Sequence, residues 1–379
     1  MLMPDYNGGS LLNLMSTIIH KYNGHTDYST LKTLSSESIR SNKTIFILID
    51  AFWYSSVPFV KDLIESVFDV NRITTVFPTS TTSAITTINT WEPPWVHGLI
   101  SWTQNMKSLG LIWIPLIHAT RYYNPISFTD GDFSETYWST MNTIYEKLKV
   151  DSSVITKSAY RNSIYTKTTS KWARNIASYD SANDIPKLLE NELRTSSEYI
   201  YLYFDDYDIA SHEYWYDNDR AIQVLRNILW LIINYIKKES LPFNLFITGD
   251  HGQIKSGPRI NLSDFSWLNS FLVIPPTGDA RHMNFFVKNG KNMDFLSYFK
   301  KNLSDYFDIF SYEDVLSLWL YGISMDSDWF RDVFWDYLAI AKNNYTIWNY
   351  LFNERVTTQR GEHGWLSENE LFIPLLSKK

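Results

Sequence analysis

The chain has 379 residues, a net charge of -7 at pH 7, a hydrophobic fraction of 44% and no cysteine. A chain of this length can bury a large core, and its apolar fraction is ordinary for a globular protein. The negative charge argues against a nucleic-acid coat bound by bulk charge, and the lack of cysteine excludes disulfides and thiolate metal sites. The abundant aromatic residues, 15 Trp, 25 Tyr and 22 Phe, favour packed layers and aromatic-lined clefts over disorder.

We expect neither a targeting segment nor a membrane span. Asp5 and Gly8-Gly9 interrupt the region where a signal peptide needs an unbroken apolar core. The most apolar helical stretch, Ile228 to Ile236, contains Asn234 and is too short to cross a bilayer. The sequence therefore predicts a cytoplasmic protein with no membrane partner, and it leaves the oligomeric state open.

The first buried strand is expected at Thr44–Ile49, a continuous β-branched and apolar run that ends on Asp50. A helix is expected over Val57–Phe68, followed by a short strand at Ile73–Phe77. The hydroxyl-rich run Thr79–Ser83 then opens another helix. A helix amino terminus with free N–H groups binds anions well, so this turn is a candidate phosphate site.

Strands and helices continue to alternate along the rest of the chain. The expected elements are strand Ser153–Thr156, helix Ile185–Leu193, strand Glu198–Phe204, helix Asn218–Lys238, strand Phe243–Ile247, a mixed segment over 257–355 with apolar runs at Phe271–Ile274 and Asn284–Val287 and a Trp-rich helical region over 312–352, and a last strand at Glu370–Leu376. Such alternation predicts an α/β fold with a mostly parallel sheet sandwiched by helices.

Side chains that can bind metal ions stand at or near the ends of four of these strands. They are Asp50, the Asp208-x-x-x-His212 pair, Asp250-His251 and His363. The carboxyl ends of parallel strands meet at one edge, so these side chains are expected to converge there. They divide into two tetrahedral sites, one of Asp208, His212 and His363 and one of Asp50, Asp250 and His251. Two ions so placed can clamp a phosphoryl group.

The motifs resemble those of the alkaline phosphatase superfamily, and within it the type I phosphodiesterase / nucleotide pyrophosphatase family. The matching stretches, in order, are Phe46–Asp50, Phe77–Thr82 running on to Pro94 and His97-Gly98, Asp208–His212, Thr248–Gly252, and His363-Gly364 before Leu371–Leu375. The resemblance implies one alkaline-phosphatase-like catalytic domain over residues 1–379, with insertion or cap segments at about 98–195 and 257–355.

The resemblance also implies a role for each matching residue. Thr81 stands in the nucleophile's position and would also touch the second metal, whose protein ligands match Asp50, Asp250 and His251. Asp208, His212 and His363 match the ligands of the first metal. The implied reaction is the hydrolysis of a small phosphodiester or pyrophosphate, with a nucleotide as the leading substrate, through a phospho-threonine. Two divalent ions are implied, with Zn²⁺ favoured and Mn²⁺ or Fe compatible with the ligand set.

Two substrate-binding candidates and one departure from the family pattern bear on specificity. The backbone N–H of Thr82 can donate to a phosphate oxygen, and Arg281 can reach a phosphate or serve in a structural pairing. Family members follow the nucleophile with an Asn that helps to hold the phosphate, whereas this chain has Thr82-Ser83-Ala84. A phosphomonoesterase or phosphonate-ester hydrolase on the same fold therefore stays open, as does a catalytically inactive metal-binding scaffold.

Overall fold

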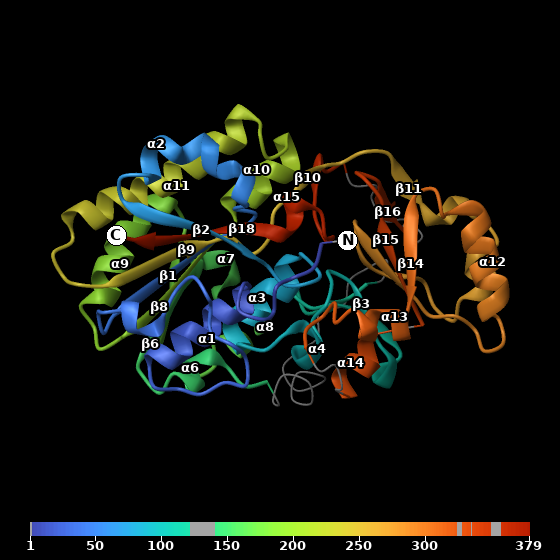
Figure 1. The fold of residues 1–379 in the computed structure, drawn as a ribbon, viewed down its shortest axis with the longest axis horizontal. Coiled ribbons are helices and arrows are strands. Elements are labelled where there is room, and N and C mark those ends of the chain that lie inside the picture. The colour runs from blue at the N-terminus through green and yellow to red at the C-terminus, as the bar shows by residue number, and fades with distance from the viewer. Residues whose placement is uncertain (1, 122–140, 324–327, 335, 350–357) are drawn as a thin grey trace.

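The computed structural model describes residues 2–121, 141–323, 328–334, 336–349 and 358–379. Its centre is a seven-stranded sheet, which Figure 1 shows between two layers of helices. The strand order is β2 (Phe68–Thr74), β18 (Phe372–Lys378), β9 (Asn244–Thr248), β1 (Thr44–Ile49), β8 (Tyr199–Phe204), β6 (Ser152–Lys157) and β7 (Asn175–Tyr179). Of these seven, β18 alone runs opposite, because it pairs antiparallel with both β9 and β2. The predicted α/β fold with a mostly parallel sheet is confirmed.

Strand β1 lies at the middle of the sheet, and its side chains alternate between two apolar cores. Phe46 and Leu48 pack into the core on one face, whereas Ile45, Ile47 and Ile49 pack into the core on the other. Helices cover both faces, so a strand without polar alternation is what this position requires. The first layer contains α1 (Leu11–Lys21), α3 (Thr81–Thr90), α6 (Ile144–Lys147) and α8 (Ile164–Thr169); the second contains α2 (Lys61–Ile64), α9 (Ile185–Leu193), α10 (Asp206–Tyr214) and α11 (Asp219–Lys238).

A smaller lobe, at the right in Figure 1, has its own sheet and core. Its sheet order is β12 (Thr277–Asp279), β13 (His282–Phe285), β15 (Tyr337–Ala341) and β14 (Phe307–Ser311), and α12 (Asn292–Asn302) packs Phe295 and Phe299 against it. The remaining short elements are α4 (Pro94–His97), β3 (Gln104–Met106), β4 (Leu111–Ile114), β5 (Ala119–Thr120), α7 (Ser158–Arg161), β10 (Ile254–Lys255), β11 (Arg259–Asn261), α13 (Tyr312–Ser317), α14 (Asp328–Val333), β16 (Thr346–Trp348), β17 (Gly361–Glu362) and α15 (Glu368–Leu371).

The segments expected as insertions divide between the two lobes. Strands β6 and β7 fall within 98–195 but lie in the central sheet, whereas β3 to β5 form a separate three-stranded sheet. Strands β11 to β16 fall within 257–355 and build the smaller sheets. Residues 122–140, 324–327, 335 and 350–355 of these segments lie outside the described residues. The division into one catalytic domain with insertion segments remains a proposal.

Three expected elements differ from the structure. The helix expected over Val57–Phe68 is a 3₁₀ turn at Tyr54–Val60 with Pro58 inside it, followed by the single turn of α2, and strand β2 already begins at Phe68. The Trp-rich region over 312–352 is helical only in α13 and α14 and contains strands β15 and β16. The strand expected at Ile73–Phe77 is strand β2, which begins at Phe68 and already ends at Thr74. In the second and third cases, pairing with distant strands overrides the local pattern.

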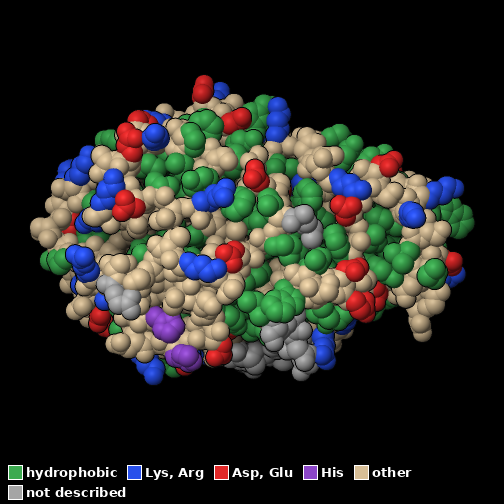
Figure 2. All heavy atoms as spheres, viewed as in Figure 1, with side chains coloured by type: hydrophobic (Ala, Val, Ile, Leu, Met, Phe, Trp, Pro, Cys, Tyr) green, Lys and Arg blue, Asp and Glu red, His purple; other side chains and the backbone are tan. Residues whose placement is uncertain are grey.

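Two further features are the distribution of charge on the surface and the character of the helices. Figure 2 shows basic and acidic side chains interspersed over one face of the molecule, the pattern of an ordinary solvated surface. Among the described residues, no helix combines the length and the apolar character needed to cross a membrane.

Candidate active site

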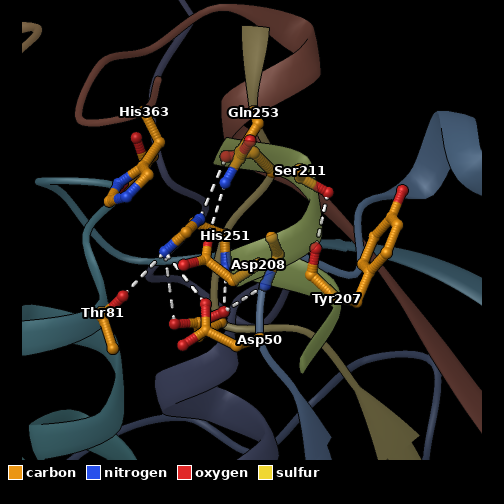
Figure 3. Close-up of polar contacts among 12 residues, drawn as sticks. Asp50, Thr81, Tyr207, Asp208, Ser211, His251, Gln253 and His363 are labelled. Carbon is orange, nitrogen blue, oxygen red and sulfur yellow. Dashed lines mark hydrogen bonds and ion pairs between the residues drawn. The ribbon is translucent and has the colours of Figure 1, made fainter. Parts of the chain in front are cut away.

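The predicted ligands meet at one edge of the central sheet. Strands β1, β8 and β9 are mutually parallel, so Asp50, Asp208 and Asp250 follow strand ends at the same edge. Strand β18 is antiparallel to β9, so its beginning lies at that edge too, and this brings His363 to the others. Figure 3 shows Thr81, Asp50, Asp208 and His363 around the imidazole of His251.

Backbone carbonyls fix the orientation of the three histidines. The Nδ1 atoms of His212, His251 and His363 lie 2.8, 3.0 and 3.0 Å from the carbonyl oxygens of Gly361, Gly252 and Thr79. A carbonyl only accepts, so each Nδ1–H donates, and Nε2 is the ring nitrogen left for another partner. This is the outer-shell arrangement that orients metal-ligating histidines in known sites.

The ligand atoms form two overlapping groups. One consists of Asp208, His212 and His363, and the other of Asp50, Asp208 and His251; within each group the ligand atoms lie within 4.8 Å of one another. The first group has the composition predicted from the sequence. In the second, Asp208 takes the place expected for Asp250, and the Asp250 Oδ2 atom lies 3.4 Å from His251 Nε2. Asp208 is therefore shared between the two groups.

Two buried carboxylate oxygens close to His251 Nε2 have no hydrogen-bond partner among the described residues. They are Asp50 Oδ1 and Asp250 Oδ2, and each lies 3.4 Å from Nε2 of His251. Their other oxygens are engaged: Asp50 Oδ2 accepts from the Tyr203 hydroxyl at 2.5 Å, and Asp250 Oδ1 accepts from the backbone N–H of Ala51 at 3.0 Å. A buried anion without a donor is costly, and a divalent cation is the partner that oxygen and imidazole ligands fit.

The titration of these groups reflects burial and crowded like charges. Burial, together with Asp250 and Asp208, raises the pKa of Asp50 well above its ordinary value. Burial also disfavours the charged forms of Asp208 and His212, but their mutual attraction outweighs it, lowering the pKa of Asp208 and raising that of His212 to about 9. Burial and the nearby His251 hold the pKa of His363 well below its usual range. Positive charge placed among these carboxylates would stabilise them.

Thr81 begins helix α3 and faces the predicted ligands. Its hydroxyl oxygen lies 3.0 Å from His251 Nε2, and Ser80 is the N-cap of the helix. The N–H groups of the first turn, including that of Thr82, have no partner within the helix, so they are available at this end of α3. Thr81 and Thr82 both line a cavity of about 560 Å³.

The cavity extends from the ligand cluster into the smaller lobe. At one end are Thr81, Asp208, His212 and His363; further along it is lined by Trp102, Ile114, Leu116, Met283, Ile347 and Trp348, with Arg121, Asp279 and Glu362 as further charged groups. The site thus combines a hydroxyl, a polar cluster and an aromatic wall, which is the composition of a small-molecule pocket.

Arg281 does not line this cavity, which corrects the expectation that it could reach a substrate phosphate. Its side chain is fully buried; Nε lies 3.3 Å from Glu370 Oε1, and Nη2 donates to the carbonyl of Asn343 at 2.6 Å. The guanidinium also donates to the carbonyl of Tyr345 and lies over the Trp365 ring. A buried Arg needs such partners, so the structural pairing is the role observed.

Sequence reasoning missed several residues beside the predicted ligands. Gln253 donates to Asp208 Oδ1, and Tyr203 donates to Asp50. Gln253 and Glu362 were detectable as polar neighbours of His251 and His363 in the sequence. Tyr203 and Asp279 carried no such signal, because only the fold brings them to the site.

Glycine stands on either side of Asp250-His251 because the backbone there packs closely against neighbouring segments. Neither Gly249 nor Gly252 has a positive φ. A Cβ at 249 would lie 2.1 Å from the carbonyl oxygen of Phe52, and one at 252 would lie 1.9 Å from that of Asn369. Close backbone approach, rather than a special dihedral, therefore requires glycine at both positions.

The comparison with protein families agrees with this architecture. The model of the type I phosphodiesterase / nucleotide pyrophosphatase family matches residues 45–365. The chain belongs to this family, within the alkaline phosphatase superfamily, and is a phosphoric ester hydrolase. A search of curated proteins found no match.

Solved structures share the fold at low sequence identity. Murine ectonucleotide pyrophosphatase / phosphodiesterase 5 is 17% identical, with a TM-score of 0.65 over 88% of this chain and 87% of that one. An inactive threonine-to-alanine variant of the same murine protein, in complex with AMP, is 17% identical with a TM-score of 0.64, over 89% of this chain and 88% of that one. Phosphonoacetate hydrolase from Sinorhizobium meliloti, in complex with phosphonoformate, is 16% identical with a TM-score of 0.62, over 88% of this chain and 89% of that one.

Proposed function

We propose that the protein hydrolyses phosphodiester or pyrophosphate bonds with Thr81 as nucleophile and two divalent metal ions as cofactors. The observation that carries the proposal is the Thr81 hydroxyl 3.0 Å from His251 Nε2, beside the unpartnered Asp50 and Asp250 oxygens. Asp208, His212 and His363 would hold one ion, and Asp50, Asp250 and His251 the other, with Asp208 close to both. Bound there, divalent ions would acidify hydroxyl groups and neutralise charge that develops on phosphate oxygens.

The chain's own groups account for the remaining steps. The Thr81 oxygen attacks phosphorus in line, a bond forms between them, and the bond from phosphorus to the leaving oxygen breaks on the far side. The N–H of Thr82, at the amino terminus of α3, is placed to donate to a non-bridging oxygen. Water then hydrolyses the phospho-threonine, releases the phosphomonoester or phosphate, and restores the Thr81 hydroxyl.

Nucleotides are the proposed substrates. The AMP complex of the murine variant supports this choice, as do the Trp102 and Trp348 side chains that line the cavity. An aromatic face can stack on a nucleobase, which would orient the ester beyond it.

The test is hydrolysis of bis(p-nitrophenyl) phosphate by protein reconstituted with Zn²⁺ or Mn²⁺, extended to nucleotide diesters and phosphonoacetate. We expect Thr81→Ala to lose at least about a thousandfold in rate, and Thr81→Ser to keep measurable activity, because the serine retains the nucleophilic oxygen. Acid quenching during turnover should trap phosphate on Thr81, detectable by mass spectrometry. Undiminished hydrolysis by Thr81→Ala would exclude the nucleophile, and an inert metal-loaded protein would favour the scaffold alternative.

A further inference from the structure

Asp279 is an acidic side chain on the cavity wall that the proposed reaction does not use. Its side chain is only 7% exposed and lines the cavity together with Thr81 and His363. Oδ1 accepts from the backbone N–H of Trp102 at 2.8 Å, whereas Oδ2 has no hydrogen-bond partner among the described residues. One carboxylate oxygen is thus held by the wall, and the other is buried 4.0 Å from His282 Nε2 without a hydrogen-bond partner in the described part of the chain.

Its close approach to Gly364 and its place in the cavity wall put this carboxylate near His363 and Thr81. The Asp279 Cβ lies 3.4 Å from where a Cβ on Gly364 would stand, and Gly364 directly follows His363. Burial raises the pKa of Asp279, while His282, the Trp102 N–H, Ser80 and His251 lower it. Ser80 directly precedes Thr81, so the groups that act on Asp279 include the neighbours of the nucleophile.

The nearest basic side chain does not neutralise Asp279. His282 Nε2 lies 4.0 Å from Asp279 Oδ2, and its Nδ1 lies 3.0 Å from the carbonyl oxygen of Gly364. Burial lowers the pKa of His282, which keeps its imidazole neutral. The guanidinium of Arg281 points to Glu370 instead, and Arg121, a cation that lines the same cavity, donates to the carbonyl of Asn349 at 2.7 Å. Asp279 therefore places a carboxylate in the wall of the cavity that Thr81 and His363 also line.

We propose that Asp279 sets the charge of the phosphate group that the enzyme accepts, so that monoanionic diesters are favoured over dianionic monoesters. A monoester carries nearly one more negative charge than a diester above pH 6, and a partly buried carboxylate repels that extra charge with little screening. The inference rests on the proposed function, and it supplies the diester preference that the missing family Asn left open.

The test compares Asp279→Asn with the native protein on p-nitrophenyl phosphate and bis(p-nitrophenyl) phosphate at one pH and salt concentration. Asparagine keeps the Oδ1 acceptor for Trp102 and removes the charge. We expect the native protein to prefer the diester, and the ratio of monoester to diester kcat/KM to rise about tenfold in Asp279→Asn, the size of effect for one nearby unit charge. Asp264→Asn, which removes an exposed charge from the same lobe, should leave the ratio unchanged.

An unchanged ratio in Asp279→Asn, an equal shift in Asp264→Asn, or a native preference for the monoester would overturn the inference. If the native protein hydrolyses neither ester, the proposed function fails, and calorimetric binding still tests Asp279. In that case the affinity for inorganic phosphate should rise in Asp279→Asn relative to the affinity for dimethyl phosphate, and equal changes for both ligands would reject the role.

Discussion

At the scale of single residues, strand β8 contains three tyrosines that can be compared directly, because burial raises the pKa of all three hydroxyl groups. They are Tyr199, Tyr201 and Tyr203, which occupy every second position of the strand and so lie on one side of it. Only the Tyr203 hydroxyl donates to a predicted ligand, Asp50 Oδ2. The hydroxyls of Tyr199 and Tyr201 are buried without a hydrogen-bond partner among the described residues. Tyr203 is therefore a positioning residue that turns Asp50 Oδ1 toward His251.

We expect Tyr203→Phe to weaken metal binding about tenfold, because Asp50 loses the hydrogen bond that holds its orientation. The measurement is isothermal titration calorimetry with Zn²⁺ or Mn²⁺ on metal-free protein. Tyr201→Phe is the matched control, since it removes a buried hydroxyl from the same strand without breaking a hydrogen bond, and should leave the affinity within about twofold. Equal losses in both variants would show that Tyr203 acts through general packing.

At the scale of elements, the sequence predicted the strands and helices whose pattern is continuous and whose neighbours do not alter them. Strand β1 and helix α9 have the predicted bounds, because an unbroken β-branched run and an amphipathic helix with an early Pro are strong local signals. The helix expected over Val57–Phe68 was wrong: the chain forms a 3₁₀ turn around Pro58 and the single turn of α2, and from Phe68 it pairs with β18. That pairing joins segments some three hundred residues apart, so no local pattern reports it.

The candidate site likewise has residues that the sequence predicted and contacts that it did not. Its aspartates and histidines were predicted because they stand at strand ends or in family motifs, and the parallel topology brings them together. Three features of the site were not predictable: Asp208 belongs to both groups of ligand atoms, Arg281 pairs with Glu370, and Asp279 lines the same cavity as Thr81. Each depends on the direction of a side chain after folding, which residue spacing does not specify.

The segment that follows helix α3 supports a prediction about stability. The Tyr28 hydroxyl, near the amino terminus, donates to Glu92, and burial raises the pKa of Glu92 to about 7, with Tyr28 and Lys147 opposing the shift. The folded state thus holds the proton more tightly than the unfolded chain does. Between about pH 4.5 and 7 the unfolded chain releases it first, so this group's contribution to stability is present at low pH and falls as the pH rises.

Glu92→Gln should remove this dependence, because glutamine stays neutral at every pH. We expect the free energy of unfolding of the variant to exceed that of the native protein by about 1–3 kcal/mol at pH 8 and by little at pH 4.5. Urea denaturation across this range measures the difference. Glu65→Gln, at an exposed carboxylate, is the control and should run parallel to the native protein. A constant difference between native and Glu92→Gln across the range would contradict the assignment.

At the scale of the whole molecule, the predicted ligands come from segments that lie far apart in the sequence, between residues 50 and 363, and meet only in the folded chain. They come from the ends of β1, β8 and β9 and from the segment before β18, and the same cavity reaches the smaller lobe through Trp102 and Trp348. Ligands that meet only in the folded chain bind an ion only when the chain is folded. Metal binding should therefore stabilise the whole fold rather than one element.

We expect free Zn²⁺ or Mn²⁺ at a hundred times its dissociation constant to raise the free energy of unfolding by about 2.7 kcal/mol for one site, and EDTA to reverse the increase. Urea unfolding with buffered metal measures it. His363→Ala should lose most of the increase, because it removes a ligand that only the final sheet pairing brings to the site. His25→Ala, at a side chain 83% exposed, should retain the full increase and so control for adventitious binding. An equal response in all three proteins would mean that the ion binds elsewhere, since a site built from the sheet edge cannot be indifferent to the loss of His363.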